Sequence, residues 1–261
     1  MEKRERIARL AADRDEEMLL ARVYDKLTAA ESRNIPAATC FLSSREQMLT
    51  KQLLPQMTLH FYGGGEHAER AVAVWLPEYL DESWLSSDDG PIACVRAEYR
   101  AEKPLSHRDF LGSLMGSGIK RETVGDIFVG EERTDFLVTR EILPYVLQNL
   151  ESAGRTKLRI RELPLTELET PAAKTKEIRD TVSSLRLDAI VGSGFSLSRG
   201  KAAEAIETGR AELNFALCQK PDKAVCEGDV ICVRGLGKLR LTQVGGNTKK
   251  GRIAIIIERF I

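Results

Sequence analysis

The stretch SLSRGKAAEAIETGRAEL, residues 196–213, predicts a short helix that begins after a serine and is followed by a strand. Ser198 has the side chain of a good N-cap, and Gly209 is placed to end the helix. Arg199 and Lys201 then fall in the first turn, where the partial positive charge of the helix makes cations unfavourable. Because free amides at a helix start bind phosphate, we expect this helix start to face a strongly anionic ligand.

A small α+β unit is predicted around this helix. A second helix is expected before it, over about 183–191, with its end at Gly192 and Gly194. Two helices against a small sheet make a unit of about 60 residues. Such a unit is only marginally stable by itself, but it can be stable when it is attached to a larger domain. The predicted strands are residues 210–215, 230–233 and 238–244.

The charge of the chain is distributed unevenly. Residues 174–261 hold 16 Lys and Arg against 10 Asp and Glu, a net charge of +6, whereas residues 1–173 hold 23 against 29, a net charge of −6. Few aromatic residues accompany the C-terminal cations, which favours recognition of folded RNA over stacking on single strands. The candidate RNA-binding residues are Arg186, Ser198, Arg199, Lys201, Arg210, Arg234, Lys238 and Arg240.

The same region resembles the S-four domain, also called the alpha-L RNA-binding motif. The resemblance implies an RNA-binding domain over residues 181–261, including a C-terminal strand. Phe215 departs from the pattern, because many members have glycine after the asparagine. The matching segments are R-L-D at 186–188, S-L-S-R at 196–199, A-x-x-x-I-x-x-G at 202–209 and E-G-D-x-I-x-V-R-G at 227–235.

Residues 89–165 predict a second α+β domain. Its order of strand, helix, strand, strand, helix and strand is that of the split βαβ, or ferredoxin-like, arrangement, which RNA-recognition domains also use. The arrangement serves many functions and predicts none by itself, and the aromatic strand signature of base stacking is missing here. The predicted elements are strands 92–99, 125–130, 135–139 and 157–163 and helices at about 106–117 and 140–153.

The remaining segments complete an α+β chain, with an N-terminal α/β region, a central ferredoxin-like domain and a C-terminal S-four domain. Residues 1–88 predict the N-terminal domain, and the polar, proline-containing residues 166–180 predict a linker that runs into a helix. The N-terminal elements are helices over 2–32 and 44–54 and a hairpin of strands 57–62 and 70–76.

Several enzyme motifs are present only in part. His107-Arg108-Asp109 resembles the catalytic loop of protein kinases, but Leu114 stands where that loop needs asparagine. GSLMGSGIK, residues 112–120, lacks the spacing of a phosphate-binding loop. Arg186-Leu187-Asp188 carries the catalytic aspartate in many pseudouridine synthases, yet only 73 residues follow it, too few for a catalytic sheet. We therefore expect Asp188 to be the structural partner of a nearby cation or amide.

A candidate second contact surface lies at the two ends of one central helix, where His107, Arg108, Lys120 and Arg121 gather; a plain solvated surface is the alternative. No metal or cofactor is predicted, because Cys218, Cys226 and Cys232 lack the pair spacing of a zinc site and the three histidines lie far from them in the sequence. The cysteines are expected to be reduced thiols of a cytoplasmic protein, and no secretory signal or membrane span is predicted.

The chain as a whole resembles the YlmH family of bacterial proteins. The resemblance rests on the S-four pattern and on LSHRDFLGSLMGSGIKRETVGDIFV, residues 105–129. It implies a non-enzymatic, cytoplasmic RNA-binding protein of ribosome-associated quality control. The implied partners are ribosomal RNA and the large ribosomal subunit, and also tRNA, as peptidyl-tRNA on obstructed subunits. We expect the protein to be a monomer. Two alternatives stay open: an RNA-modifying enzyme tethered by the S-four domain, and an interaction factor associated with cell division.

Overall fold

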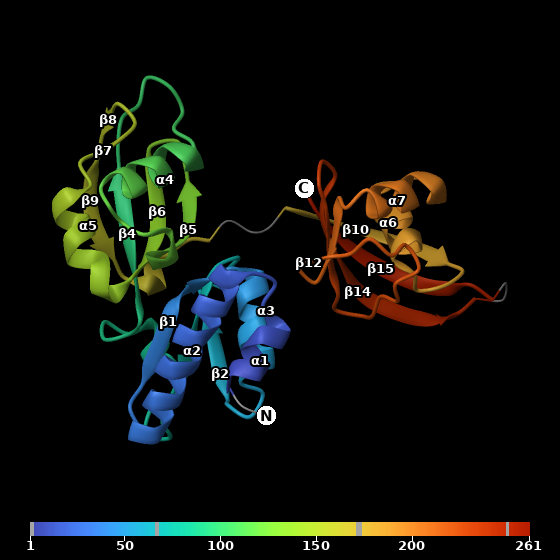
Figure 1. Cartoon of the computed structure of the whole chain (residues 1–261). Coiled ribbons are helices and arrows are strands. Elements are labelled where there is room, and N and C mark those ends of the chain that lie inside the picture. Colours follow the sequence, from blue (N-terminus) through green and yellow to red (C-terminus); the bar gives the residue numbers. More distant parts are fainter. Residues whose placement is uncertain (1–2, 66–67, 171–173, 249–250) are drawn as a thin grey trace. The chain divides into compact units, whose positions relative to one another are not determined.

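The computed structural model describes two compact units, 1–171 and 172–261, joined by a single chain segment (Figure 1). Both units combine helices with antiparallel sheets, so the predicted α+β class is confirmed. No helix in the described part of the chain is both long and apolar enough to cross a membrane. The residues described are 3–65, 68–170, 174–248 and 251–261.

Three helices cover one face of a three-stranded sheet at the N-terminal end of the first unit (Figure 1). Leu20, Leu27 and Leu53 are wholly buried in the cluster that joins helices and sheet. The predicted helices and hairpin are confirmed, except that residue 2 lies outside the described residues. The elements are α1 (Lys3–Leu10), α2 (Arg14–Arg33), β1 (Ala37–Leu42), α3 (Ser44–Leu53), β2 (Leu59–Tyr62) and β3 (Ala71–Trp75), with sheet order β1-β3-β2.

The central segment forms a four-stranded sheet with α4 and α5 on one face. Its strand order, β5-β6-β4-β9 with antiparallel neighbours, is that of the predicted split βαβ arrangement. Phe110, Phe136 and Val146 are wholly buried between the helices and the sheet. The elements are β4 (Ile92–Glu98), α4 (His107–Gly116), β5 (Val124–Val129), β6 (Arg133–Thr139), α5 (Leu143–Asn149) and β9 (Arg159–Leu163).

The predicted helix over 140–153 is too long at both ends. It begins as a 3-10 turn, η3 (Arg140–Ile142), and α5 ends at Asn149. The chain then forms a two-residue hairpin, β7 (Ser152–Ala153) and β8 (Thr156–Lys157), around Gly154. Gly154 adopts a φ of 58°, which suits a glycine in a tight turn better than the end of a helix.

The N-terminal and central segments share a buried cluster. The ring of Phe41 lies so close to the central sheet that a Cβ on Gly125 would stand 2.6 Å from it. The predicted domain boundary between residues 88 and 89 would therefore divide a shared hydrophobic core. This boundary stays a prediction. Two short 3-10 turns, η1 (Glu82–Ser86) and η4 (Leu165–Glu167), lie in the connections. The cluster consists of Phe41, Val72, Val74, Leu85, Ile92, Cys94, Leu137 and Leu163.

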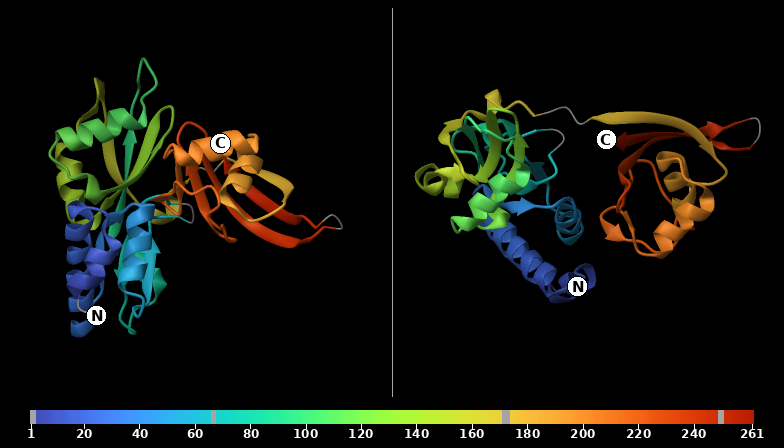
Figure 2. Two further views of the ribbon diagram at one scale, coloured as in Figure 1. Left: turned by 45° about the vertical axis from the view of Figure 1, so that its right-hand side comes forward. Right: turned by 90° about the horizontal axis from the view of Figure 1, so that it is seen from above.

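The second unit places two helices on one face of a six-stranded sheet (Figure 2). Ile190 and Ile206 of the helices are wholly buried against Leu239 and Ile257 of the sheet. The sheet order is β10-β15-β14-β13-β11-β12. The elements are β10 (Thr175–Val182), α6 (Leu187–Phe195), α7 (Arg199–Glu207), β11 (Ala211–Leu213), β12 (Ala216–Leu217), β13 (Val230–Val233), β14 (Gly237–Asn247) and β15 (Ile253–Phe260).

Two expectations for this unit are wrong. Residues 175–180, assigned to a linker running into a helix, belong to β10, where Ile178 lies opposite Ile257 of β15. That partner lies far along the chain, so no local pattern marks the strand. In addition, α6 runs through Gly192 and Gly194 to Phe195. A Cβ on Gly194 would lie 2.4 Å from Leu239, so this glycine allows the helix to pack closely on the sheet.

Candidate nucleic-acid interface

A buried carboxylate joins the starts of α6 and α7. Asp188, whose side chain is 4% exposed, accepts hydrogen bonds from Arg186 at 3.2 and 3.0 Å and from Nε of Arg199 at 3.2 Å. The predicted structural role of Asp188 is thereby confirmed. Arg186 uses both Nε and Nη2 on this carboxylate. Arg199 uses Nε alone, so its two Nη groups have no partner among the described residues, and its side chain is 60% exposed.

The start of α7 is capped and open. The hydroxyl of Ser198 accepts a hydrogen bond from the backbone N–H of Lys201 at 3.4 Å, as the sequence predicts for an N-cap. A Cβ on Gly200 would meet nothing within 4 Å, so no other element covers this turn within the described residues. Lys201 is exposed, and its ammonium group has no described partner. The first turn therefore presents amides and two cations to solvent.

The other predicted cations of this unit do not share that surface. On β14, Leu239 and Leu241 are buried under the helices, so Lys238 and Arg240 alternate with them and lie on the opposite face of the sheet. The ammonium group of Lys238 stands 4.6 Å from the ring centroid of Phe260 on that face. The expected single basic surface is therefore divided by the sheet.

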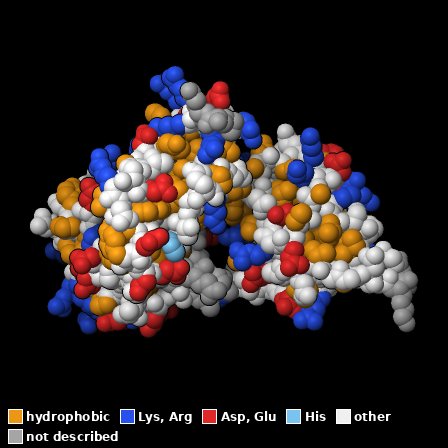
Figure 3. Space-filling view, turned by 90° about the horizontal axis from the view of Figure 1, so that it is seen from below, with side chains coloured by type: hydrophobic (Ala, Val, Ile, Leu, Met, Phe, Trp, Pro, Cys, Tyr) orange, Lys and Arg blue, Asp and Glu red, His pale blue; other side chains and the backbone are white. Residues whose placement is uncertain are grey.

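Arg210 and Arg234 lie beside each other at one end of the β11–β13 pair. The backbone N–H of Arg234 donates to the carbonyl of Arg210 at 2.9 Å, and both side chains are exposed. Figure 3 shows that Lys and Arg side chains are interspersed with Asp and Glu on the face drawn. On that face, the excess cations of residues 174–261 therefore do not form one continuous basic patch. Whether each candidate can bind RNA depends on the groups around it.

The candidate second contact surface is divided as well. His107 and Arg108 begin α4, whereas Lys120 and Arg121 follow its end. The two pairs are therefore separated by a ten-residue helix, which is about 15 Å long. Asp109 accepts hydrogen bonds from the backbone N–H and hydroxyl of Ser106 at 2.8 and 2.7 Å, and these bonds lower the pKa of Asp109. The kinase-like tripeptide is therefore the start of a helix with a capping box.

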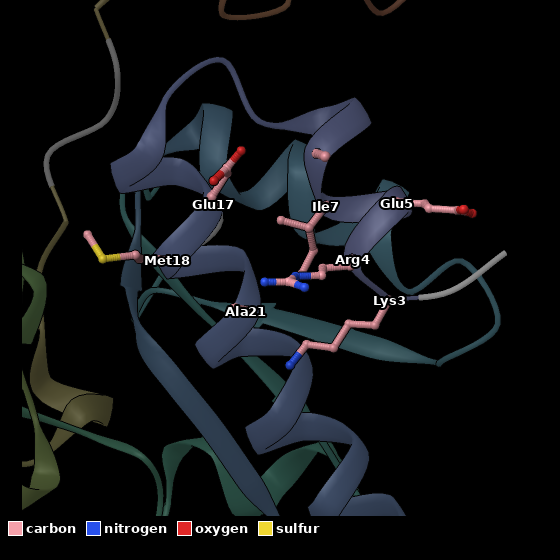
Figure 4. A pocket seen from close by; sticks show the side chains of 8 residues that line it. Lys3, Arg4, Glu5, Ile7, Glu17, Met18 and Ala21 are labelled. Atoms are coloured by element: carbon pink, nitrogen blue, oxygen red, sulfur yellow. The ribbon is translucent and has the colours of Figure 1, made fainter.

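One hollow and one buried thiol of the first unit carry no sign of a catalytic role. No group of three or more His, Cys, Asp or Glu side chains among the described residues could hold a metal ion. A hollow of about 980 Å³ lies between α1 and α2, where Lys3 reaches toward α2 (Figure 4) and binds Asp25 at 2.6 Å. Its lining holds Lys, Arg and Glu beside alkyl side chains. Burial raises the pKa of the Cys94 thiol to about 12, so that thiol is protonated at neutral pH.

Comparison with known proteins identifies the family. Residues 91–167 match the family model described as "Putative RNA-binding domain in YlmH". The chain is 35% identical over 225 residues to the Bacillus subtilis (strain 168) protein named "Ribosome-associated protein quality control protein P2", with 85% of this chain and 86% of that protein covered. This chain belongs to the YlmH family. The structure named "Cell division protein ylmH from Streptococcus pneumoniae" is 22% identical and covers 60% of this chain and 96% of that one, with a TM-score of 0.49.

The segment that matches the YlmH RNA-binding domain contains the candidate second contact surface, whereas the eight C-terminal candidates lie outside it. Lys120 and Arg121, in the matched segment, line a hollow together with Arg22 and Arg70 of the N-terminal segment. No local pattern in the sequence marks Arg22 and Arg70 as part of this site, because only the fold brings them beside residues so distant in the chain. The assignment of residues 181–261 to the S-four domain stays a prediction for this YlmH-family chain.

Low pH is expected to destabilise the second unit through Asp188. Burial raises the pKa of Asp188, but hydrogen bonds from Arg186 and Arg199 outweigh burial and lower the pKa below its ordinary value. The carboxylate therefore stabilises the fold fully above the unfolded-state pKa of about 3.9 and loses this effect as pH falls through the folded-state value. In urea unfolding between pH 6 and pH 3, the free energy of unfolding should fall more for the wild type than for Asp188→Asn. Equal falls would contradict this role.

Proposed function

We propose that this chain is a non-enzymatic, cytoplasmic RNA-binding protein that acts in ribosome-associated quality control. Its partner is structured RNA of the large ribosomal subunit, and peptidyl-tRNA on obstructed subunits is a further one. The name of the Bacillus subtilis relative and the description of the matched family model support this function. The observation that carries it is the open start of α7, where a buried carboxylate orients Arg199 beside free helix amides.

The geometry at the start of α7 suits a phosphate group. Helix amides point outward there, and the helix dipole favours negative charge. Arg199 keeps its two Nη groups for a ligand because Asp188 binds only Nε, so the planar guanidinium can donate two hydrogen bonds to one phosphate. Lys201 adds a second, mobile charge. Such contacts fix the position of the RNA backbone, and they do not distinguish one base sequence from another.

We propose that the second unit is an S-four domain. The ordered pattern from Arg186 to Gly235, together with two helices on one face of an antiparallel sheet, supports this assignment. The proposed linker is shorter than residues 166–180, because β10 begins at Thr175. The protein is proposed to act as a monomer without a metal or cofactor.

The helix face of the second unit, rather than the opposite sheet face, is expected to bind RNA. Lys201→Gln should weaken binding about three- to tenfold and lower the log–log salt slope by about one unit, since one phosphate contact is lost. Arg240→Gln removes another exposed cation, from the opposite face, and should change the affinity less than twofold. Fluorescence anisotropy of the full chain with a labelled ribosomal RNA hairpin, at several KCl concentrations, measures both effects. A larger loss for Arg240→Gln would place the interface on the other face.

A further inference from the structure

Four cations line one hollow of about 650 Å³ in the first unit. Arg22 comes from α2, Arg70 directly precedes β3, and Lys120 and Arg121 follow α4. The acidic residues of the lining are Glu46 and Glu122, so the lining carries a net charge of +2. The hollow thus lies where the segment that matches the RNA-binding family model meets the N-terminal segment.

Two of these guanidinium groups converge on one carbonyl. Nε of Arg70 donates to the carbonyl of Val124 at 3.0 Å, and Nη1 of Arg121 donates to the same oxygen at 2.5 Å. Arg70 also donates to the carbonyl of Phe41 at 2.8 Å. Burial lowers the pKa of both arginines, and the charge of Arg70 lowers the pKa of Arg121 further. Both guanidinium groups donate their hydrogen bonds to neutral backbone carbonyls. Two positive charges therefore lie close together, and no carboxylate of the described residues is bonded to either of them.

The nearby acids form no hydrogen bond with the guanidinium groups of Arg70 and Arg121, although the charges of Glu46 and Asp126 partly offset the effect of burial on the pKa of Arg70. Glu46 accepts a hydrogen bond at 2.6 Å from the backbone N–H of Ser43, the N-cap of α3. Glu122 pairs with Arg22 at 3.3 Å. Asp126, next to the hollow, accepts backbone N–H groups of residues 69 and 70 at 2.8 and 3.2 Å.

Lys120 is the remaining cation of the lining. Its side chain is exposed, and no described residue pairs with its ammonium group. An anion that entered the hollow would therefore meet an unpaired ammonium beside two arginines held only by carbonyls.

We infer that this hollow binds a phosphate group of an RNA backbone. The inference rests on the proposed function, and it adds a second RNA contact built jointly by the matched segment and the N-terminal segment. RNA is the source of the phosphate because Lys120 and Arg121 belong to residues 91–167, the segment described as an RNA-binding domain. The guanidinium group of arginine matches the geometry of phosphate oxygens, and the local excess of positive charge in the lining favours an anion there.

The test uses the full chain and a fluorescein-labelled 20-base-pair RNA hairpin. Lys120→Gln should weaken binding about three- to tenfold and lower the log–log salt slope by about one unit. Lys103→Gln is the matched control, because Lys103 is an exposed lysine of the same unit that does not line the hollow. It should leave both the affinity and the slope unchanged. Thermal unfolding of both variants should match the wild type, since both lysines are exposed.

Three outcomes would overturn the inference, and they can be told apart. If Lys120→Gln binds like Lys103→Gln while Lys201→Gln still loses affinity, the hollow is not an RNA contact and the proposed function stands. If the wild type shows no salt-dependent binding, the proposed function fails and the inference fails with it. If inorganic pyrophosphate stabilises the wild type but not Lys120→Gln, and RNA affinity is the same in both, the hollow takes a free phosphate ligand instead.

Discussion

Replacing Arg199 by glutamate is expected to lower RNA affinity at least tenfold and to lower the free energy of unfolding as well. A charge-assisted hydrogen bond contributes about 1.5–3 kcal/mol, which corresponds to a tenfold or larger change in affinity. From the sequence alone, an acid at this helix start should favour the helix. The structure reverses that expectation, because the new carboxylate would face Asp188, which lies 3.2 Å from Nε of the native arginine.

A double variant separates the two effects. Asp188→Asn removes the facing charge, so Arg199→Glu should cost less stability in that background while RNA affinity stays low. Anisotropy with a ribosomal RNA hairpin reports the affinity, and urea unfolding reports the stability. If Arg199→Glu unfolds like the wild type and still binds RNA, both the contact and its positioning by Asp188 are wrong.

Replacing Asp135 by asparagine is expected to lower the free energy of unfolding of the first unit by about 3 kcal/mol. Asp135 and Arg96 face each other on β6 and β4 and form two hydrogen bonds of 2.7 Å, and their side chains are only 6% and 10% exposed. The hydrogen bonds to Asp135 raise the pKa of Arg96. Without the carboxylate, a nearly buried guanidinium keeps its charge but loses its partner, and removal of one member of such a pair typically costs about 3–5 kcal/mol. The lower value applies because Asp135 lines a surface hollow.

Urea unfolding followed by tryptophan fluorescence measures this change, since both tryptophans, Trp75 and Trp84, belong to the first unit. Glu98→Gln is the control, because Glu98 and Arg161 form a half-exposed pair 3.9 Å apart on the same sheet. Exposed pairs contribute less than about 1 kcal/mol. If Asp135→Asn costs no more than Glu98→Gln, the buried pair does not stabilise the fold as argued.

Local patterns in the sequence predict much of this fold. The N-cap at Ser198 and the strand and helix order of the central segment follow from short-range spacing, and the structure has both. The partnership of Asp188 with a nearby cation was also predictable, because Arg186 is two residues away. These features depend on residues close together in the chain.

Features that depend on distant residues could not be read from the sequence. β10 forms on a partner strand at the other end of the unit, and Gly194 is explained only by the side chain that packs over it. The basic hollow likewise unites Arg22, Arg70 and Lys120 through the fold.

One local departure from the S-four pattern has a structural counterpart. Phe215 adopts a φ of 62° in the tight turn between β11 and β12, a backbone conformation that favours glycine. Asn214 before it has a φ of 50°, and its side chain bonds Asp229 and the backbone N–H of Val230. The side chain of Asn214 therefore helps to hold the turn.

Sedimentation with purified large ribosomal subunits tests the central claim most directly. The wild type should pellet with the subunits through a sucrose cushion at moderate salt. Lys201→Glu, which reverses an exposed charge at the start of α7 and leaves the bonds of Asp188 in place, should stay in the supernatant while its melting temperature is no lower than that of the wild type. If Lys201→Glu pellets as the wild type does, or if the wild type does not pellet at all, the start of α7 does not bind the large subunit as proposed.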